Sequence, residues 1–276
     1  MRALTDQVPT SQRDSILVFG ECNPAVDDEF VAHAQDVVLV SGHEALTLQL
    51  DRRFHLVVIG IDVLAGHDDG HRRAATHSAV QHIDRGGHLV VTHEATHDAL
   101  GDGFWTNDLR CLGSQALGCA VISLFRRGDR TTVHDLLFEA RAMISRHTPL
   151  QLAELLRGAE PPLVLDTRTH TDRERFGVIP SSVHVPRTVV EWHFDPANGY
   201  LHPAMRSFDQ PLVLVCNGGY SSSLAAANMV RLGFTSVSDL IGGHTSWAAA
   251  GLPVAPPDHS HLDTPGLDGS AINQER

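Results

Sequence analysis

Short apolar runs alternate with helix-like stretches along this chain, and that alternation is the strongest constraint on its fold. In the first half, five runs are rich in Val, Ile, Leu and Phe, as β-strands are. Strands this apolar suit a sheet covered on both faces, which favours an open, doubly wound α/β domain. The predicted strands are Ser15–Phe19, Val37–Val40, His55–Ile61, His88–Thr92 and Cys119–Phe125, and the predicted helices are Ala25–Ala34, Glu44–Arg52, His71–Ile83 and one after Trp105.

The pattern restarts near residue 147. A helical apolar stripe from Val133 to Ile144 is expected to close the first domain. Thr148 is then a predicted N-cap, with Pro149 behind it and Gln151 placed for a capping box. In the second half we predict strands Leu163–Asp166, Ser182–Val185, Leu212–Val215 and Val237–Ile241, and helices Leu150–Leu156 and Ser222–Leu232.

These elements predict two α/β domains. The first, at 1–146, is Rossmann-like and doubly wound, and the second, at 147–254, has a parallel sheet. The remaining stretch, 255–276, is rich in Pro, His, Asp, Gly and Ser and is expected to be a disordered tail.

The charge balance argues against nucleic acid as a partner, because a net charge of −12 offers no basic face for phosphates. All 21 basic residues are arginine, which excludes lysine Schiff-base chemistry and a lysine-based phosphate loop. The chain has neither an apolar run long enough to span a bilayer nor a signal-peptide pattern at its start. We therefore expect a cytoplasmic enzyme that does not bind membranes.

Four scattered cysteines without a Cys-x-x-Cys pair argue against a disulfide framework or a structural zinc site. Cys216 differs from the others because it stands between the apolar run 211–215 and a helix-like stretch. Gly218 and Gly219 allow the backbone to curl so that successive N–H groups point at one spot, in front of a helix N-terminus. Such a nest stabilises an anion, so it predicts a lowered pKa for the Cys216 thiol and a nucleophilic thiolate. The alternative is a buried cysteine at a strand end with no chemistry.

Several features of the second half recur in order. They are the Thr148-Pro149 helix start, Asp166-Thr-Arg168 at a strand end, Gly177–Pro186, the Cys216 loop, Gly242-Gly243 and then Trp247. Together they make residues from about 148 to 254 resemble a rhodanese-family domain. The resemblance implies that Cys216 accepts sulfur and becomes a persulfide, without a cofactor or a metal. It also implies a substrate-binding loop of Asn217, Gly218, Gly219, Tyr220, Ser221 and Ser222, with Asp166, Arg168, Gly242 and Gly243 as structural neighbours.

The loop departs from many of the family because it has no basic residue, with serine at position 221. Charge for a dianionic donor such as thiosulfate must then come from outside the loop, and Arg187 and Arg168 are the nearest candidates. Each has an ordinary alternative: Arg187 as a solvated surface arginine, and Arg168 in a salt bridge to a nearby acid. Alternatively, the donor is a persulfide or a protein. Val178 stands where the family usually has histidine, and we expect this difference to affect packing and not chemistry.

The first domain resembles, more weakly, the core of class I methyltransferases, through the strand 54–64 and the Gly86-Gly87 turn before the next strand. It departs from them in having one glycine after its first strand and no acidic residue after its second. We therefore expect a degenerate S-adenosylmethionine site. His93-Glu94-x-x-His97 matches a zinc-peptidase motif, but it follows a strand instead of lying on a helix. We expect no metal there.

The sequence therefore predicts a sulfurtransferase with a small sulfane-sulfur donor and a thiol acceptor, which can be a protein. Cys111 and Cys119 are expected to be small core residues at a helix–strand junction, although one of them could also receive sulfur from Cys216. Two alternatives stay open: a non-catalytic rhodanese-like binding or sensing module, and a bifunctional methyltransferase–sulfurtransferase. A homodimer is compatible with the sequence.

Overall fold

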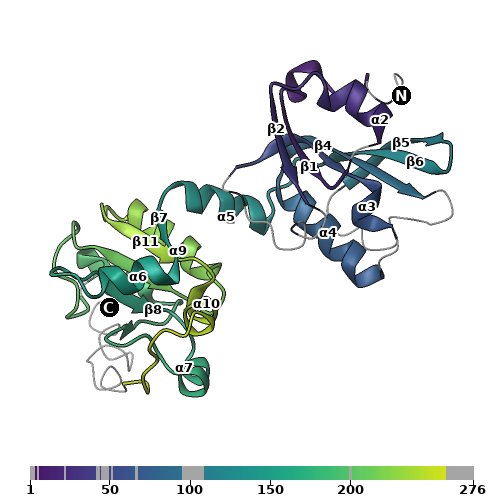
Figure 1. Cartoon of the computed structure of the whole chain (residues 1–276). Coiled ribbons are helices and arrows are strands. Elements are labelled where there is room, and N and C mark those ends of the chain that lie inside the picture. The colour runs from purple at the N-terminus through teal and green to yellow at the C-terminus, as the bar shows by residue number, and fades with distance from the viewer. Residues whose placement is uncertain are drawn as a thin grey trace. The chain divides into compact units, whose positions relative to one another are not determined.

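Each half of the chain builds its own sheet in the computed structural model (Figure 1). The structure describes residues 4, 6–21, 23–41, 44, 50, 52–65, 68–94, 109–198 and 201–258. The chain divides into two units, Met1–His134 and Asp135–Arg276. Most of the helical stretch from Val133 to Ile144, which was expected to close the first domain, thus falls within the second unit.

The first unit has a six-stranded sheet of order β2-β1-β3-β4-β6-β5. The first four strands in this order are parallel, whereas β6 runs antiparallel to both of its neighbours. Its strands are β1 (Ser15–Phe19), β2 (Asp36–Val40), β3 (Phe54–Ile59), β4 (Ile83–Glu94), β5 (Leu109–Leu117) and β6 (Ala120–Arg127), and its helices are η1 (Thr10–Gln12), α2 (Pro24–Val26), the π-helical η2 (Asp27–Val31), α3 (Ile61–Leu64) and α4 (Asp69–Gln81).

All five predicted strands of this unit are present, but the predicted helix after Trp105 is wrong where the structure describes the chain. Residues 109–117 form strand β5 instead, which pairs with β6 in an antiparallel hairpin. Cys111 lies in β5 and Cys119 in the turn between the two strands, and both are exposed. They are therefore not the small core residues that we expected. Most of the predicted helix Glu44–Arg52 lies outside the described residues.

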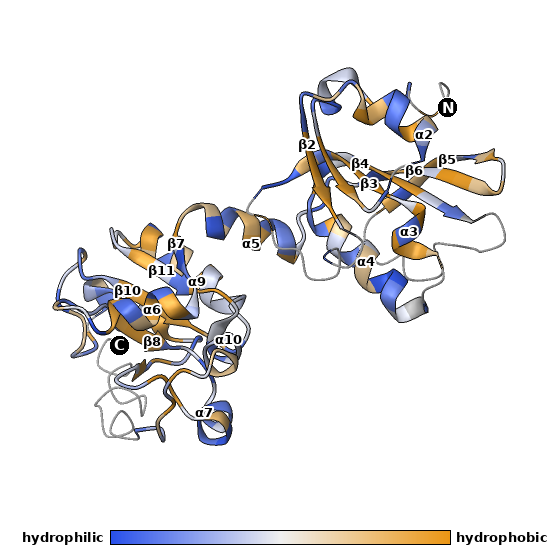
Figure 2. Cartoon of the chain, in the orientation of Figure 1, coloured by the Kyte–Doolittle hydropathy of each residue, from blue (hydrophilic) through white to orange (hydrophobic). Residues whose placement is uncertain are grey.

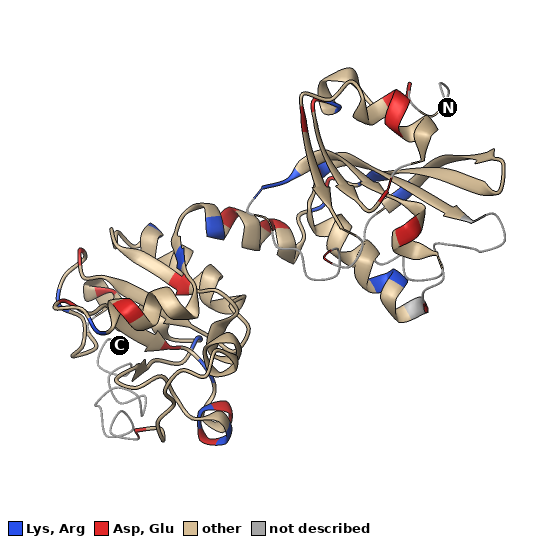
Figure 3. Cartoon of the chain, viewed as in Figure 1, with Lys and Arg blue, Asp and Glu red and all other residues tan. Residues whose placement is uncertain are grey.

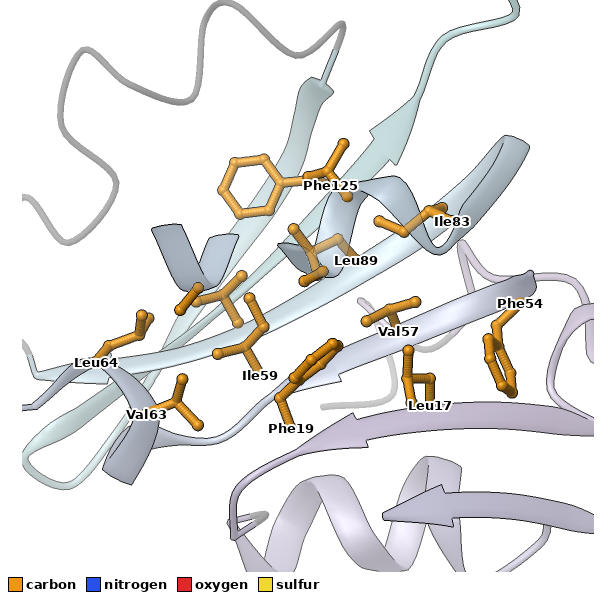
Figure 4. Close-up of a cluster of buried hydrophobic side chains, with 14 of the residues drawn as sticks. Leu17, Phe19, Phe54, Val57, Ile59, Val63, Leu64, Ile83, Leu89 and Phe125 are labelled. Atoms are coloured by element: carbon orange, nitrogen blue, oxygen red, sulfur yellow. The ribbon is translucent and has the colours of Figure 1, made fainter. Parts of the chain in front are cut away.

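Alternate residues of the first strand enter different cores, which shows that the sheet is buried on both faces. Leu17 and Phe19 belong to one hydrophobic cluster with α4, while Ile16 and Val18 belong to another with Phe30. The first cluster is shown in Figure 4, and the apolar character of the strands is visible in Figure 2. This two-sided burial agrees with the prediction made from the apolar runs.

The second unit has a five-stranded sheet of order β7-β11-β10-β8-β9, in which every pair is parallel. The strands are β7 (Ser145–His147), β8 (Leu163–Asp166), β9 (Val183–His184), β10 (Leu212–Val215) and β11 (Val237–Leu240). The helices are α5 (Val133–Ala142), α6 (Pro149–Leu155), α7 (His170–Phe176), α8 (Val190–Phe194), the 3₁₀ turn η5 (Pro196–Asn198), α9 (Ser221–Arg231) and α10 (Gly243–Ala249).

The start and the end of the second unit both extend past the predicted limits. At the start, β7 pairs with β11 and ends at His147, directly before the capping box that Thr148 and Gln151 form on α6. At the end, Ala255 forms a two-way backbone bridge with Val178, so the ordered chain continues beyond residue 254. Val178 is buried there, in line with the packing role expected for it. No described helix is both long and apolar enough to cross a membrane.

Candidate active site

Cys216 lies directly after β10, the middle strand of the second sheet. Its loop leads into α9, whose first residue is Ser221. The carboxyl edge of an open parallel sheet is where ligands bind, because the loops there leave a crevice between strands and helices. Cys216 is 7% exposed and therefore buried, so its thiol is largely shielded from water.

Hydrogen-bond donors surround the sulfur. The backbone N–H of Gly219 donates to Cys216 Sγ at 3.2 Å, and the Ser222 hydroxyl donates at 3.1 Å. Burial alone would raise the pKa of the Cys216 thiol. The Ser221 and Ser222 hydroxyls and the N–H groups of Ser222 and Tyr220 outweigh it and hold the pKa of Cys216 below its ordinary value. The thiolate fraction at neutral pH is therefore increased, as the nest predicted.

Glycine is required at two points where backbones meet behind the loop. Gly219 has φ of +71°, and a Cβ there would lie 2.8 Å from the Gly242 nitrogen. Gly243 has φ of +59°, and a Cβ there would lie 2.4 Å from the Cys216 carbonyl oxygen. This close approach lets His244 N–H donate to that same carbonyl at 2.8 Å. Helix α10 therefore fixes the back of the Cys216 loop.

The outer side of the loop is polar and open. The Asn217 side-chain amide donates to Asp172 on α7 at 2.9 Å. Hydrogen bonds from Asn217 and Thr169 lower the pKa of Asp172, so this carboxylate is charged at neutral pH. Acidic and basic residues lie together on α7 (Figure 3). Tyr220 is 51% exposed at the rim, and its ring covers Gly218, where a Cβ would come within 2.9 Å of it.

Asp166 and Arg168 form a buried ion pair beside the loop, not an open anion site. Arg168 binds both carboxylate oxygens of Asp166 and the Gly177 carbonyl, and Arg173 lies 3.5 Å from the same carboxylate. Both partners of a buried pair are held tightly, because separating them would leave an uncompensated charge. The pair thus holds the end of β8, and the structural role predicted for Asp166 and Arg168 stays a prediction.

Arg187 is also paired. Its guanidinium donates to both carboxylate oxygens of Glu191, at 3.0 and 3.1 Å, and Asn228 on α9 donates to the same carboxylate at 2.7 Å. The Arg187 side chain is partly exposed. Its predicted role in substrate binding stays a prediction.

Comparison with known proteins identifies the family of this site. Residues 148–250 match the model of the rhodanese-like domain. Thiosulfate sulfurtransferase GlpE of Pseudomonas savastanoi pv. phaseolicola is 34% identical over 104 residues, which cover 38% of this chain and 88% of that protein. The chain belongs to the rhodanese-like family.

Other relatives match the rhodanese-like domain over different spans. A sulfurtransferase of Allochromatium vinosum is 28% identical over 42% of this chain and 99% of its own length. GlpE of Pseudoalteromonas translucida is 47% identical, but the match covers only 43% of that protein and 16% of this chain. A solved structure from Rhodopseudomonas palustris, described as a possible tyrosine phosphatase of unknown function, is 31% identical over 45% of this chain and 95% of that one, with a TM-score of 0.43.

Some polar residues around the rhodanese-like loop were not singled out from the sequence. Arg141 on α5 donates to the Gly219 carbonyl, and the Ser223 hydroxyl lies within hydrogen-bond distance of that same carbonyl and of Asp239 on β11. Asp239 is fully buried and pairs with Arg146 on β7 at 2.8 Å. The signal in the sequence is an aspartate within a short predicted strand, since a buried carboxylate needs a partner.

No cluster that could hold a metal ion occurs among the described residues. Of the zinc-peptidase motif, His93 and Glu94 end strand β4, and the other residues lie outside the described part. In the first unit, the Asp62 side chain packs against the loop that follows β1. Its carboxylate accepts the Glu21 N–H at 2.8 Å, and a Cβ at Gly20 would lie 2.3 Å from it.

Proposed function

We propose that this protein is a sulfurtransferase that carries sulfane sulfur on Cys216. The observation that carries the proposal is the buried thiol whose sulfur accepts hydrogen bonds from Gly219 and Ser222 and whose pKa is lowered. The names of the relatives support the class of reaction, since several are called sulfurtransferases. A charged thiolate in a nest of amides is suited to attack sulfur and to hold the resulting anion.

The reaction has two steps. The Cys216 thiolate attacks the outer sulfur of a donor, forming an S–S bond while the donor's own sulfur bond breaks; with thiosulfate the leaving group is sulfite. The product is a Cys216 persulfide anion, held by the same donors that held the thiolate. An acceptor thiolate then attacks the terminal sulfur, takes it as a new persulfide, and releases the Cys216 thiolate. Such a covalent intermediate predicts ping-pong kinetics.

The charged side chains around the Cys216 loop affect which sulfur donor can bind. Arg168 and Arg187, the two cations expected to bind a dianion, are each paired with a carboxylate. Asp172 adds a negative charge beside Asn217. These charges favour a persulfide donor, low-molecular-weight or on a protein, over free thiosulfate, the donor in the names of the GlpE relatives.

Intact-mass spectrometry tests the proposal. Incubation with thiosulfate, or separately with glutathione persulfide, is expected to add one sulfur atom to the wild-type chain and none to Cys216→Ser. Cys111→Ser is the matched control, because it removes an exposed thiol of the first unit and should keep the gain. If neither donor adds sulfur to the folded wild type, the enzyme proposal fails and the binding-module alternative takes its place.

The bifunctional alternative has its own test. It requires S-adenosylmethionine binding by the first unit, where Asp62 occupies the loop after β1. A rise in the thermal unfolding temperature with S-adenosylmethionine would favour it. An unchanged temperature at millimolar ligand would leave the sulfurtransferase proposal alone. We expect the latter.

A further inference from the structure

Arg141 reaches the Cys216 loop from a helix that precedes the family-matching segment 148–250. It lies in the last turn of α5. Its guanidinium donates to the Gly219 carbonyl oxygen at 3.0 Å and to the Ser223 hydroxyl at 3.4 Å. It also lies 5.8 Å from the centre of the Tyr220 ring, within the range of a cation–π contact.

The carbonyl that Arg141 binds belongs to a peptide that faces the sulfur. The Gly219 C=O and the Tyr220 N–H are part of one peptide unit, and a trans peptide points these two groups in opposite directions. No cis peptide occurs in the described chain. Anchoring the carbonyl on the Arg141 side therefore directs the Tyr220 N–H to the other side, toward Cys216 Sγ, where it contributes to the lowered pKa of the thiol.

Ser223 is a second residue that contacts the Gly219 carbonyl oxygen. The Ser223 hydroxyl lies 3.1 Å from the Gly219 carbonyl and 2.6 Å from the buried Asp239 carboxylate. Asp239 is in turn bound by Arg146 at 2.8 Å. A hydroxyl has one proton, so Ser223 can donate to only one of these two oxygens at a time. When it donates to the charged Asp239, Arg141 is the donor that remains for the Gly219 carbonyl.

We propose that Arg141 is a positioning residue for Cys216: it clamps the Gly219–Tyr220 peptide so that the loop's N–H groups converge on the sulfur. The loop has no basic residue of its own, and Arg141 supplies a cation from a neighbouring helix. A charged donor also polarises the peptide, which strengthens the hydrogen bond that its N–H gives to a thiolate or persulfide. Only the consequence for catalysis rests on the proposed function; the effect on thiol acidity stands without it.

The test measures the rate of Cys216 alkylation by iodoacetamide against pH in the full-length protein, followed by peptide mass. In Arg141→Gln the inflection of the profile is expected to move to higher pH. The alkylation rate at neutral pH should fall ~3- to 10-fold, as a pKa rise of about half a unit to one unit gives. Arg141→Lys keeps the charge and a donor and should recover part of the shift.

Arg157→Gln is the matched control, because it removes an exposed arginine at the end of α6 that has no hydrogen bond to the loop in the structure. Its profile should match the wild type. A profile for folded Arg141→Gln that superimposes on the wild type would overturn the proposal. If that variant does not fold, a profile for Arg141→Lys that matches the wild type in both inflection and rate would overturn it instead, because a lysine cannot reproduce the forked donor geometry of arginine.

The outcomes separate the two proposals. Sulfur loading depends on a donor, whereas alkylation does not. A shifted alkylation profile together with no sulfur gain would keep Arg141 as the positioning residue and reject the sulfurtransferase. An unshifted alkylation profile together with a gain of sulfur would support the sulfurtransferase and reject Arg141 as the positioning residue.

Discussion

At the scale of single residues, Cys216 shows two opposing effects on one thiol. Burial penalises the thiolate, and hydrogen bonds to the sulfur stabilise it. The lowered pKa of Cys216 shows that the hydrogen bonds outweigh burial. Each pKa unit corresponds to about 1.4 kcal/mol between the two protonation states, so the loss of one donor should be measurable.

Ser222→Ala removes the hydroxyl that donates to Cys216 Sγ at 3.1 Å. We expect the pKa of the thiol to rise and the alkylation profile to shift to higher pH, with a rate at neutral pH lower by ~3-fold or more. The Cys216 thiol should also make the stability of the fold depend on pH. Because its pKa is lower in the folded than in the unfolded chain, the thiol stabilises the fold at pH values above the pKa of the unfolded thiol. That contribution is lost as the pH falls through the folded pKa. Ser207→Ala, at an exposed serine, is the control, and equal profiles for both variants would contradict the prediction.

The features of the site that the sequence can indicate are the local ones. Cys216 and its glycine loop are contiguous, so the turn and the helix start could be inferred from their order. Arg141 could not be inferred, because its contact with Gly219 joins residues 78 positions apart. It also lies in a helix that the apolar stripe assigned to the first domain. The ion pair between Arg187 and Glu191 joins residues only four positions apart, so it could have been inferred from the sequence, but it was not singled out.

At the scale of elements, the loop is held between α9 in front and α10 behind. Helix α10 begins at Gly243, and its first N–H groups donate to the Cys216 and Asn217 carbonyls. The predicted Gly242-Gly243 turn therefore acts as the support of the active loop. Strand β5 was missed by contrast, because the apolar residues of its sequence, Leu109–Leu117, form no continuous run and are interrupted by Arg, Gly, Ser and Gln. Its place at the sheet edge explains why a weak strand pattern suffices.

Gly243→Ala tests this support. The residue has positive φ, and a Cβ would lie 2.4 Å from the Cys216 carbonyl, so the loop or α10 must move. Gly251→Ala is the matched control: φ is +68° there, and nothing lies within 4 Å of the added Cβ. We expect Gly251→Ala to cost only the backbone strain, ~1–2 kcal/mol in urea unfolding. Gly243→Ala should cost more and also slow Cys216 alkylation; equal costs and an unchanged rate would contradict it.

At the scale of the whole molecule, each of the two units has hydrophobic clusters of its own. In each half the apolar runs became parallel strands, and the β4–β6–β5 part of the first sheet is the exception. An apolar run predicts a strand but not the direction in which that strand crosses the sheet. The antiparallel hairpin of β5 and β6 could therefore not be inferred from apolar content. Among the described residues, Gly219 and Ser222, which donate to Cys216 Sγ, and Arg141, which donates to the Gly219 carbonyl, all lie in the second unit with Cys216.

Phe54→Ala tests that independence. Phe54 is 1% exposed in the core of the first unit, and its truncation is expected to cost ~3–5 kcal/mol there. Two of the three tryptophans, Trp192 and Trp247, lie in the second unit, so most of the tryptophan fluorescence reports on that unit and can be followed in urea together with far-UV circular dichroism. The dichroism should gain an early transition while most of the fluorescence change keeps its wild-type midpoint, and Cys216 alkylation should be unchanged before that midpoint. Phe194→Ala, in the core of the second unit, should instead move the fluorescence transition. A single coincident transition displaced as a whole by Phe54→Ala would mean that the two cores unfold as one.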